Sequence, residues 1–200
     1  MMGARERSSQ GAITFWIAAG LFLVGAILGA ALAGSLGHVL TPLVQSVRKE
    51  AVSMKSQSAW ATEWMLFANN WTVSLYMLVG GLFFGLLPIL GVVMNGALVG
   101  YVVRQLAVSA HANPVVIVLA GIVPHGIFEI PAYCLASGFG MRLGWLVWRT
   151  ITKRADRATW KRTVYAAVPT LLWVTGLLFV AAFIESHITP VLLRLALGHA

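Results

Sequence analysis

Long apolar runs separated by short polar stretches dominate the chain, and their lengths predict membrane-spanning helices. Each run stays apolar over about 20 residues, which is the length that crosses the hydrocarbon core of a bilayer as an α-helix. Membrane β-strands would instead alternate apolar and polar residues over about ten positions. The pattern predicts an all-α, polytopic transmembrane helical bundle in a single integral membrane domain. About five spans are expected, at residues 13–39, 71–87, 89–107, 114–140 and 163–185.

The second and third spans are separated by an argument from length. Residues 71–106 are 36 mostly apolar residues, and one helix of that length would extend about 54 Å, against about 30 Å of hydrocarbon. Pro88 and Gly91 lie near the middle of this run. We therefore expect two short spans joined by a tight turn, with a single long kinked helix as the alternative. Asn69-Asn70 precedes the run and predicts its N-cap.

Two less apolar segments predict amphipathic helices at the membrane surface. In residues 40–68, apolar side chains recur at helical spacing and continue into an aromatic stripe that includes Trp60 and Trp64. In residues 141–160, apolar and basic side chains alternate around the helix. Both patterns are typical of interfacial helices with aromatic side chains at headgroup depth. The first segment can either rest on the membrane or dock a partner protein, and the sequence leaves both readings open.

Composition and charge exclude a soluble domain and place one loop against a membrane surface. The chain is 59% hydrophobic and 10% charged, whereas soluble domains have about 25% charged residues. Of its 14 Lys and Arg residues, seven lie between residues 142 and 162. We expect this loop to contact the anionic cytoplasmic leaflet of the lipid bilayer. The contacts are expected from Arg142, Arg149, Lys153, Arg154 and Arg157.

The distribution of cations also predicts the topology. Five spans place the amino terminus and loop 141–162 on one side with 9 cations, against 5 on the other. The positive-inside rule makes the cation-rich side cytoplasmic in a multi-pass protein of the cell (plasma) membrane. A four-span arrangement gives 10 against 4, so the rule does not choose the number of spans. No folded basic surface or phosphate loop is evident, and we expect no nucleic-acid partner.

Polar residues inside the apolar runs are the candidate functional residues. His125 and Glu129 lie four positions apart, as do Glu129 and Tyr133, so all three share one helix face. A carboxylate in hydrocarbon costs roughly 2.5–3.5 kcal/mol, so Glu129 should be paired, protonated or exposed to a polar cavity. Asn95 and Glu185 are the further candidates for this polar cluster. Pro124 and Pro131 predict a kinked or interrupted helix around it.

These residues also form a recognisable pattern. Four patches carry it: Pro124-His125-Gly126 with Glu129, Pro131-Ala132, Gly138 and Arg142-Leu143-Gly144; Asn69-Asn70; Asn95-Gly96 with Gly100; and residues 181–185 followed by Ile188-Thr189-Pro190. Over roughly residues 60–190, the chain resembles the stage II sporulation protein M family. The resemblance implies an integral membrane protein of about five helices. In spore formers, such a protein is a scaffold that recruits peptidoglycan-degrading partners to the septal membrane.

Three functions compete for the polar cluster. A zinc site needs three or four ligands; one helix supplies two, and Glu185 or His187 would have to pack alongside. HExxH is absent, no Ser nucleophile has a base at recognisable spacing, and Cys134 is the single cysteine. We therefore expect no enzyme, no metal, no other cofactor and no disulfide. A transporter or channel for an ion or small solute, using His125 and Glu129, is the alternative to packing chemistry.

The reading favoured by the sequence is a non-enzymatic membrane scaffold at the cell envelope. Its partners would be peptidoglycan-remodelling or other envelope proteins. Small-residue faces, such as the pair Gly25 and Gly29, permit close approach of helices and allow a homodimer.

Overall fold

The computed structural model describes residues 4–35, 37, 41–42, 45, 58–109 and 113–197, and these residues are almost entirely helical. This confirms the all-α class. The described elements are α1 (Ala4–Ala31), α3 (Ala59–Val79), a short 3-10 turn (Gly80–Leu82), α4 (Leu86–Ser109), α5 (Pro114–Ile117), a π-helical segment (Val118–Ile122), α6 (Val123–Ile151), α7 (Arg157–His187) and α8 (Thr189–Leu197).

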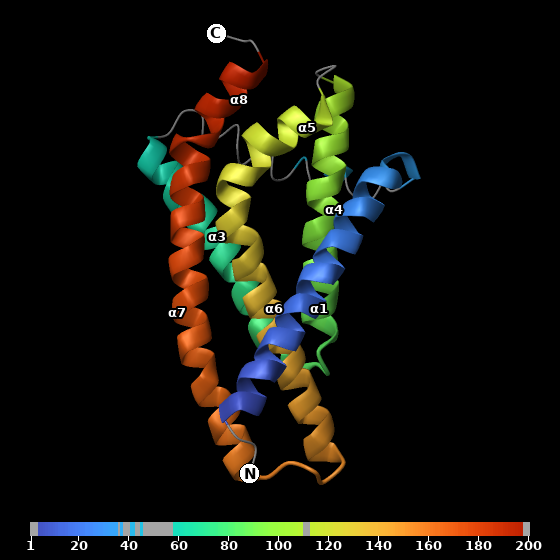
Figure 1. Cartoon of the computed structure of the whole chain (residues 1–200), viewed down its shortest axis with the longest axis vertical. Helices are drawn as coiled ribbons and strands as arrows, with labels where there is room; N and C mark the ends of the chain where they lie inside the picture. The colour runs from blue at the N-terminus through green and yellow to red at the C-terminus, as the bar shows by residue number, and fades with distance from the viewer. Residues whose placement is uncertain are drawn as a thin grey trace.

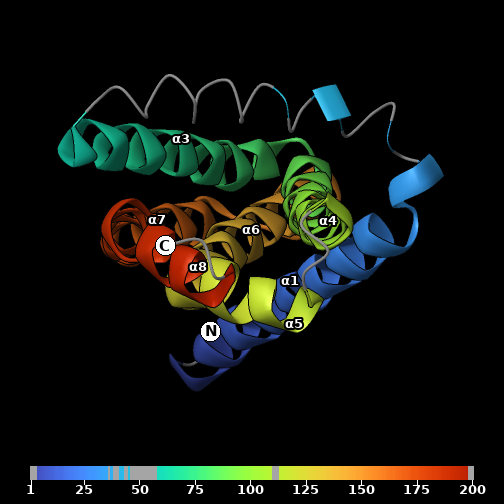
Figure 2. The same cartoon turned by 90° about the horizontal axis from the view of Figure 1, so that it is seen from above.

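The long helices form three layers. Seen from above, α3 lies on one side, α7, α6 and α4 form the middle layer, and α1 crosses the opposite side (Figure 2). Figure 1 shows the start of α1 at the same end of the bundle as the turn between α6 and α7, with α8 at the other end. The amino-terminal end of α1 and the basic loop between α6 and α7 therefore lie at the same end of the bundle.

Five long helices in the described part of the chain cross the bundle, and four of them are long and apolar enough to span a membrane. These four regions are Gln10–Ala31, Leu86–Val108, Pro114–Ile151 and Arg157–His187. Helix α3 also runs along the bundle but is not among them. It carries the buried polar residues Glu63, Asn70 and Ser74 on one face. The protein is a multi-pass helical bundle.

Glycines allow α1 to pack closely against α4 of the middle layer. A Cβ added at Gly25 would collide with the Val93 carbonyl of α4, and a Cβ at Gly96 would collide with the Phe22 carbonyl of α1. Gly29 and Gly100 make the same kind of approach to the opposite helix. The close helix approach predicted from Gly25 and Gly29 is confirmed. Because this face is already used within the chain, it no longer supports a homodimer.

The boundaries predicted around α3 are wrong. We expected an interfacial helix to end at residue 68 and a span to begin at 71, but α3 is one helix from Ala59 to Val79. No glycine or proline interrupts it, and Trp71 on α3 donates a hydrogen bond to Thr175 on α7 at 3.0 Å. Its N-cap is Ser58, which accepts from the Ala61 N–H, and not Asn69-Asn70. Of the predicted segment 40–68, residues 40, 43, 44 and 46–57 lie outside the described residues.

The turn between the second and third long helices comes earlier than predicted. We placed it at Pro88, but α3 ends at Val79 and Pro88 is buried in the first turn of α4, where a proline needs no N–H partner. The reversal occupies residues 80–85, with positive φ values at Phe84 and Gly85. Only glycine adopts such a conformation without steric cost. Gly85 therefore favours a turn at this position, although Phe84 adopts a positive φ beside it.

The helix interruption predicted from the prolines is present, and it takes the form of a π-helical segment. Pro124 has no N–H and lies in the first turn of α6. Just before it, the Val123 N–H reaches back five residues to the Val118 carbonyl, the i→i+5 pattern of a π-helix. Pro131 lies inside α6 without ending the helix.

The predicted interfacial helix over residues 141–160 does not exist as a separate element. Residues 141–151 continue α6, and α7 begins at Arg157. Gly140 and Gly144 allow the continuation to pack closely on the turn at residues 80–85, because a Cβ at Gly144 would collide with the Gly85 N. The basic loop is therefore a helical hairpin. Asp156 caps α7, and hydrogen bonds from the Thr159 hydroxyl and N–H hold the pKa of its carboxyl below the usual value.

Candidate functional site

The candidate site forms where the beginning of α6 meets the end of α7 and the start of α8. His125 lies in the first turn of α6, Glu129 one turn further, and Tyr133 a third turn on, so that the three share one face. Glu185 is near the end of α7, and Thr189 is the first residue of α8. We call His125, Glu129, Tyr133, Glu185 and Thr189 the α6–α7 polar cluster.

Hydrogen bonds orient the members of this cluster. The Tyr133 hydroxyl donates to Glu129 Oε1 at 2.8 Å. His125 Nδ1 lies 3.3 Å from Thr189 Oγ1, and His125 Nε2 lies 3.8 Å from Glu129 Oε2. The His125 and Glu129 side chains are only 13% and 18% exposed. Each of these two side chains thus has one polar atom engaged by a hydroxyl group and the other directed toward its neighbour.

Glu185 completes the cluster from a second helix. Ligand atoms of His125, Glu129 and Glu185 all lie within 4.8 Å of one another. The sequence had left open whether Glu185 or His187 would join His125 and Glu129. The structure brings Glu185 to this group. Two carboxyl groups and an imidazole at this separation can hold a cation or share a proton, or bind one another through hydrogen bonds.

Asn95 was expected to bond across helices, and this expectation is wrong for the hydrogen bond that the structure describes. Its amide Nδ2 donates to the Gly91 carbonyl of the same helix, α4, at 2.9 Å. The motif residue Gly126 is buried, between the half-buried Pro124 and His125 and the half-buried Glu129. Pro124 and Gly126 have no polar side-chain atoms, so they contribute to the start of α6 and not to the cluster.

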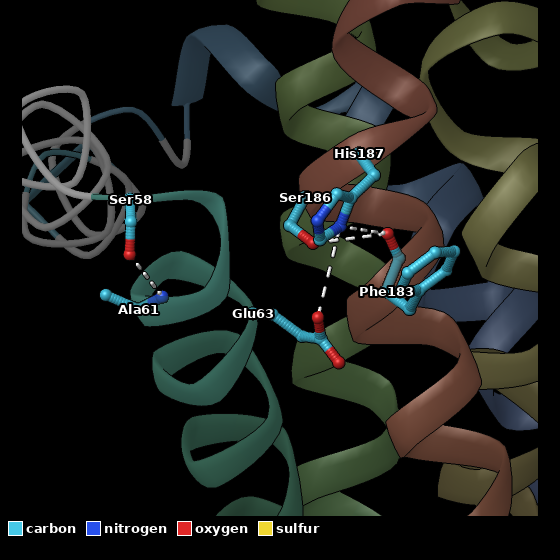
Figure 3. Close-up of polar contacts among 6 residues, drawn as sticks. All are labelled: Ser58, Ala61, Glu63, Phe183, Ser186 and His187. Atoms are coloured by element: carbon cyan, nitrogen blue, oxygen red, sulfur yellow. Dashed lines mark hydrogen bonds and ion pairs between the residues drawn. The ribbon is translucent and has the colours of Figure 1, made fainter.

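A second histidine–glutamate pair lies nearby, and sequence reasoning missed its acid. His187 Nδ1 on α7 is 3.9 Å from Glu63 Oε2 on α3 (Figure 3). Glu63 is 3% exposed, and its Oε2 has no hydrogen-bond partner among the described residues. His187 Nδ1 also lies 2.7 Å from Ser186 Oγ and 3.1 Å from the Phe183 carbonyl. Glu63 is the one charged residue of α3, in the sequence TEW, and this was the signal that could have identified it.

The basic hairpin encloses a hollow at the opposite end of the bundle. Its volume is about 1050 Å³, and it is bounded by the start of α1, the end of α6, the hairpin and the start of α7. Four of the five predicted lipid-contacting cations line it: Arg142, Arg149, Lys153 and Arg154. Arg162 lines it in place of Arg157. The hollow is separate from the α6–α7 polar cluster and contains none of its residues.

Comparison with known proteins identifies the family. The family model described as "Stage II sporulation protein M" matches residues 18–190. The chain is also 29% identical over 125 residues to uncharacterized protein MJ0793 of Methanocaldococcus jannaschii, an alignment that covers 62% of this chain and 69% of that protein. No solved structure matches the chain significantly. Together with its apolar helices, the match over residues 18–190 shows that this chain is a membrane protein belonging to the stage II sporulation protein M family.

Proposed function

We propose that the protein is a non-enzymatic membrane scaffold that holds envelope-remodelling partners at the cell membrane. The observation that carries the proposal is that the polar side chains inside the bundle bond one another. Thr189 on α8 contacts His125 on α6, and Trp71 on α3 bonds Thr175 on α7. Within α6, Tyr133 bonds Glu129 and orients it. Side chains that bond one another in this way fix helix packing.

The hollow of about 1050 Å³ supports a membrane role at the opposite end. It lies between the basic hairpin and α1, and not at Glu129. Several cations around one hollow attract the anionic headgroups of the cytoplasmic leaflet. With this end cytoplasmic, the α6–α7 polar cluster lies toward the outer face of the plasma membrane.

The start of α3 is the surface that we propose for partners. Trp60 and Trp64 are 68% and 65% exposed, although they lie at the end of a helix that packs along α6 and α7. Tryptophan is enriched in interface cores as well as at headgroup depth. Trp173 on α7 is similarly exposed, at 69%, but lies within an apolar span and should face lipid.

Site-specific photo-crosslinking in membranes tests the scaffold. A photoreactive residue placed at position 64 should give discrete protein adducts, and the same residue at 173 should give none, because that position faces lipid. Adducts should be identified by mass spectrometry and confirmed as complexes by native purification with the tagged partner. Equal protein adducts at both positions, or none at either, would contradict the scaffold.

A transporter is the second candidate, and the approach of Glu185 to His125 and Glu129 favours it. Transport through this cluster requires Glu129 to exchange charge or ligand during the cycle, whereas packing requires only its shape and hydrogen bond. If the protein is a scaffold, vesicles that contain wild type and vesicles that contain Glu129→Gln should show the same flux of protons and metal cations. Glu129-dependent flux, with the variant still folded, would replace the scaffold by the transporter.

A further inference from the structure

We propose that His125, Glu129 and Glu185 form a binding site for a first-row divalent cation, with Zn²⁺ as the best-fitting ion. The site would join α6 to the end of α7, and it goes beyond the scaffold role. The argument rests on the donor set, on the hydrogen bonds that orient it, and on the apolar surroundings.

The donor set matches this class of metal. One imidazole nitrogen and two carboxylate oxygens are ligands that Zn²⁺ and Mn²⁺ accept. Ca²⁺ takes six to eight oxygen ligands, more than this cluster supplies. Cys134 is not a ligand, because its side chain is buried against Ala18, Phe22 and Val92 in another part of the core.

Hydrogen bonds direct the ligand atoms toward a common point. Metal-binding histidines usually give their second ring N–H to an oxygen, which fixes the ring. Here His125 Nδ1 faces Thr189 Oγ1 at 3.3 Å, and this leaves Nε2 toward Glu129. Tyr133 occupies Glu129 Oε1 and leaves Oε2 available. Thr189 and Tyr133 are thus the positioning residues.

The distances are close to those that a metal requires. Ligands on one tetrahedral Zn²⁺ at about 2.0–2.2 Å lie roughly 3.4 Å apart. The three ligand atoms already lie within 4.8 Å of one another. Closing the remaining gap takes side-chain movements of about 1 Å from helices that stay in place.

The surroundings favour a divalent ion over leaving the cluster without one. Two carboxylates at this separation within apolar helices repel each other when both are ionised. A single proton would neutralise only one of them, while one divalent cation neutralises both and also uses the imidazole nitrogen. A metal at this position would lock α6 to α7, and through Thr189 it would also position α8.

Metal binding by the purified full chain tests the proposal. Protein in detergent is treated with a chelator, and Zn²⁺ is returned in competition with a chromophoric chelator. Wild type should bind one Zn²⁺ per chain and unfold at a higher temperature with the metal. Glu185→Gln and His125→Asn should lose stoichiometric binding, and Tyr133→Phe should bind about 10- to 100-fold more weakly.

The second histidine–glutamate pair supplies matched controls. His187 Nδ1 and Glu63 Oε2 are 3.9 Å apart and lie at the same end of the bundle, but no third histidine, cysteine or carboxylate among the described residues joins them. Glu63→Gln and His187→Asn should therefore leave Zn²⁺ affinity unchanged. If wild type does not bind Zn²⁺, if Glu185→Gln binds normally, or if the control variants weaken binding equally, the site is refuted.

X-ray absorption on wild-type protein keeps the proposal testable if the ligand variants do not fold. The expected spectrum has only nitrogen and oxygen neighbours at about 2.0–2.2 Å, with an imidazole contribution. A sulfur neighbour at about 2.3 Å would place the metal at Cys134 and overturn the assignment.

Discussion

Replacing Gly25 by alanine should separate α1 from α4 and expose Cys134. Gly25 lies on α1, where a Cβ would collide with the Val93 carbonyl of α4. A backbone carbonyl cannot move aside as a flexible side chain can. Cys134 is 1% exposed and belongs to the core cluster of Ala18 and Phe22 of α1 with Val92 of α4, against which Val93 packs. The single cysteine of the chain therefore reports whether α1 stays in place.

The magnitude follows from two opposing effects. Overpacking a well-packed core costs typically 1–3 kcal/mol, and a collision with backbone belongs at the upper end, about 3 kcal/mol. Alanine gains about 1 kcal/mol over glycine in helix propensity. The net destabilisation is about 2 kcal/mol, which corresponds to roughly a 30-fold larger open population.

The assay is the rate of Cys134 alkylation in detergent micelles, measured by mass spectrometry. When opening is fast relative to labelling, the rate follows the open population. Gly25→Ala should therefore be labelled about 30-fold faster than wild type.

Gly20 provides the matched control on the same helix, because a Cβ there meets nothing within 4 Å. Gly20→Ala should gain helix propensity without a collision, and its Cys134 should be labelled no faster than in wild type. If both variants are labelled at the same rate, helix propensity and not the close α1–α4 contact governs this part of the bundle, and the reasoning fails.

Two further predictions concern side chains that make specific hydrogen bonds. Trp71→Phe should lower the free energy of unfolding by about 0.5–1.5 kcal/mol, because its indole N–H donates to Thr175 at 3.0 Å; a double-mutant cycle with Thr175→Val should show that the two losses are not additive. Asp156→Ala should lower the unfolding temperature at pH 7, whereas Asp156→Ser, which keeps a capping oxygen, should lower it less. The folded-state pKa of Asp156 is depressed, so its contribution is present above the unfolded-state pKa and is lost as the pH falls through the folded-state value. A difference between wild type and Asp156→Ala that persists unchanged well below that pH would contradict this assignment.

The sequence by itself determined the fold class, most of the long helices and the family. Apolar runs of about 20 residues predict spanning helices because lipid offers no partners for backbone polar groups. Helical spacing placed His125, Glu129 and Tyr133 on one face, and the structure confirms that they lie together. The motif around these residues led to the same family that the comparison shows. These are local properties, which need no knowledge of neighbouring helices.

Only the tertiary structure decided which distant residues meet. Glu185 and His187 are two positions apart, and helix spacing directs them to different faces; the packing of α7 brings Glu185 to the α6–α7 polar cluster and directs His187 to Glu63. Asn95 was a candidate member of the cluster because its side chain is polar and lies in an apolar run, but it bonds within its own helix. The turn at residues 80–85 and the continuation of α6 to residue 151 likewise depend on close contacts between glycines of different elements. Contacts of this kind depend on how helices approach one another. The hydrophobic pattern of a single segment does not contain that information.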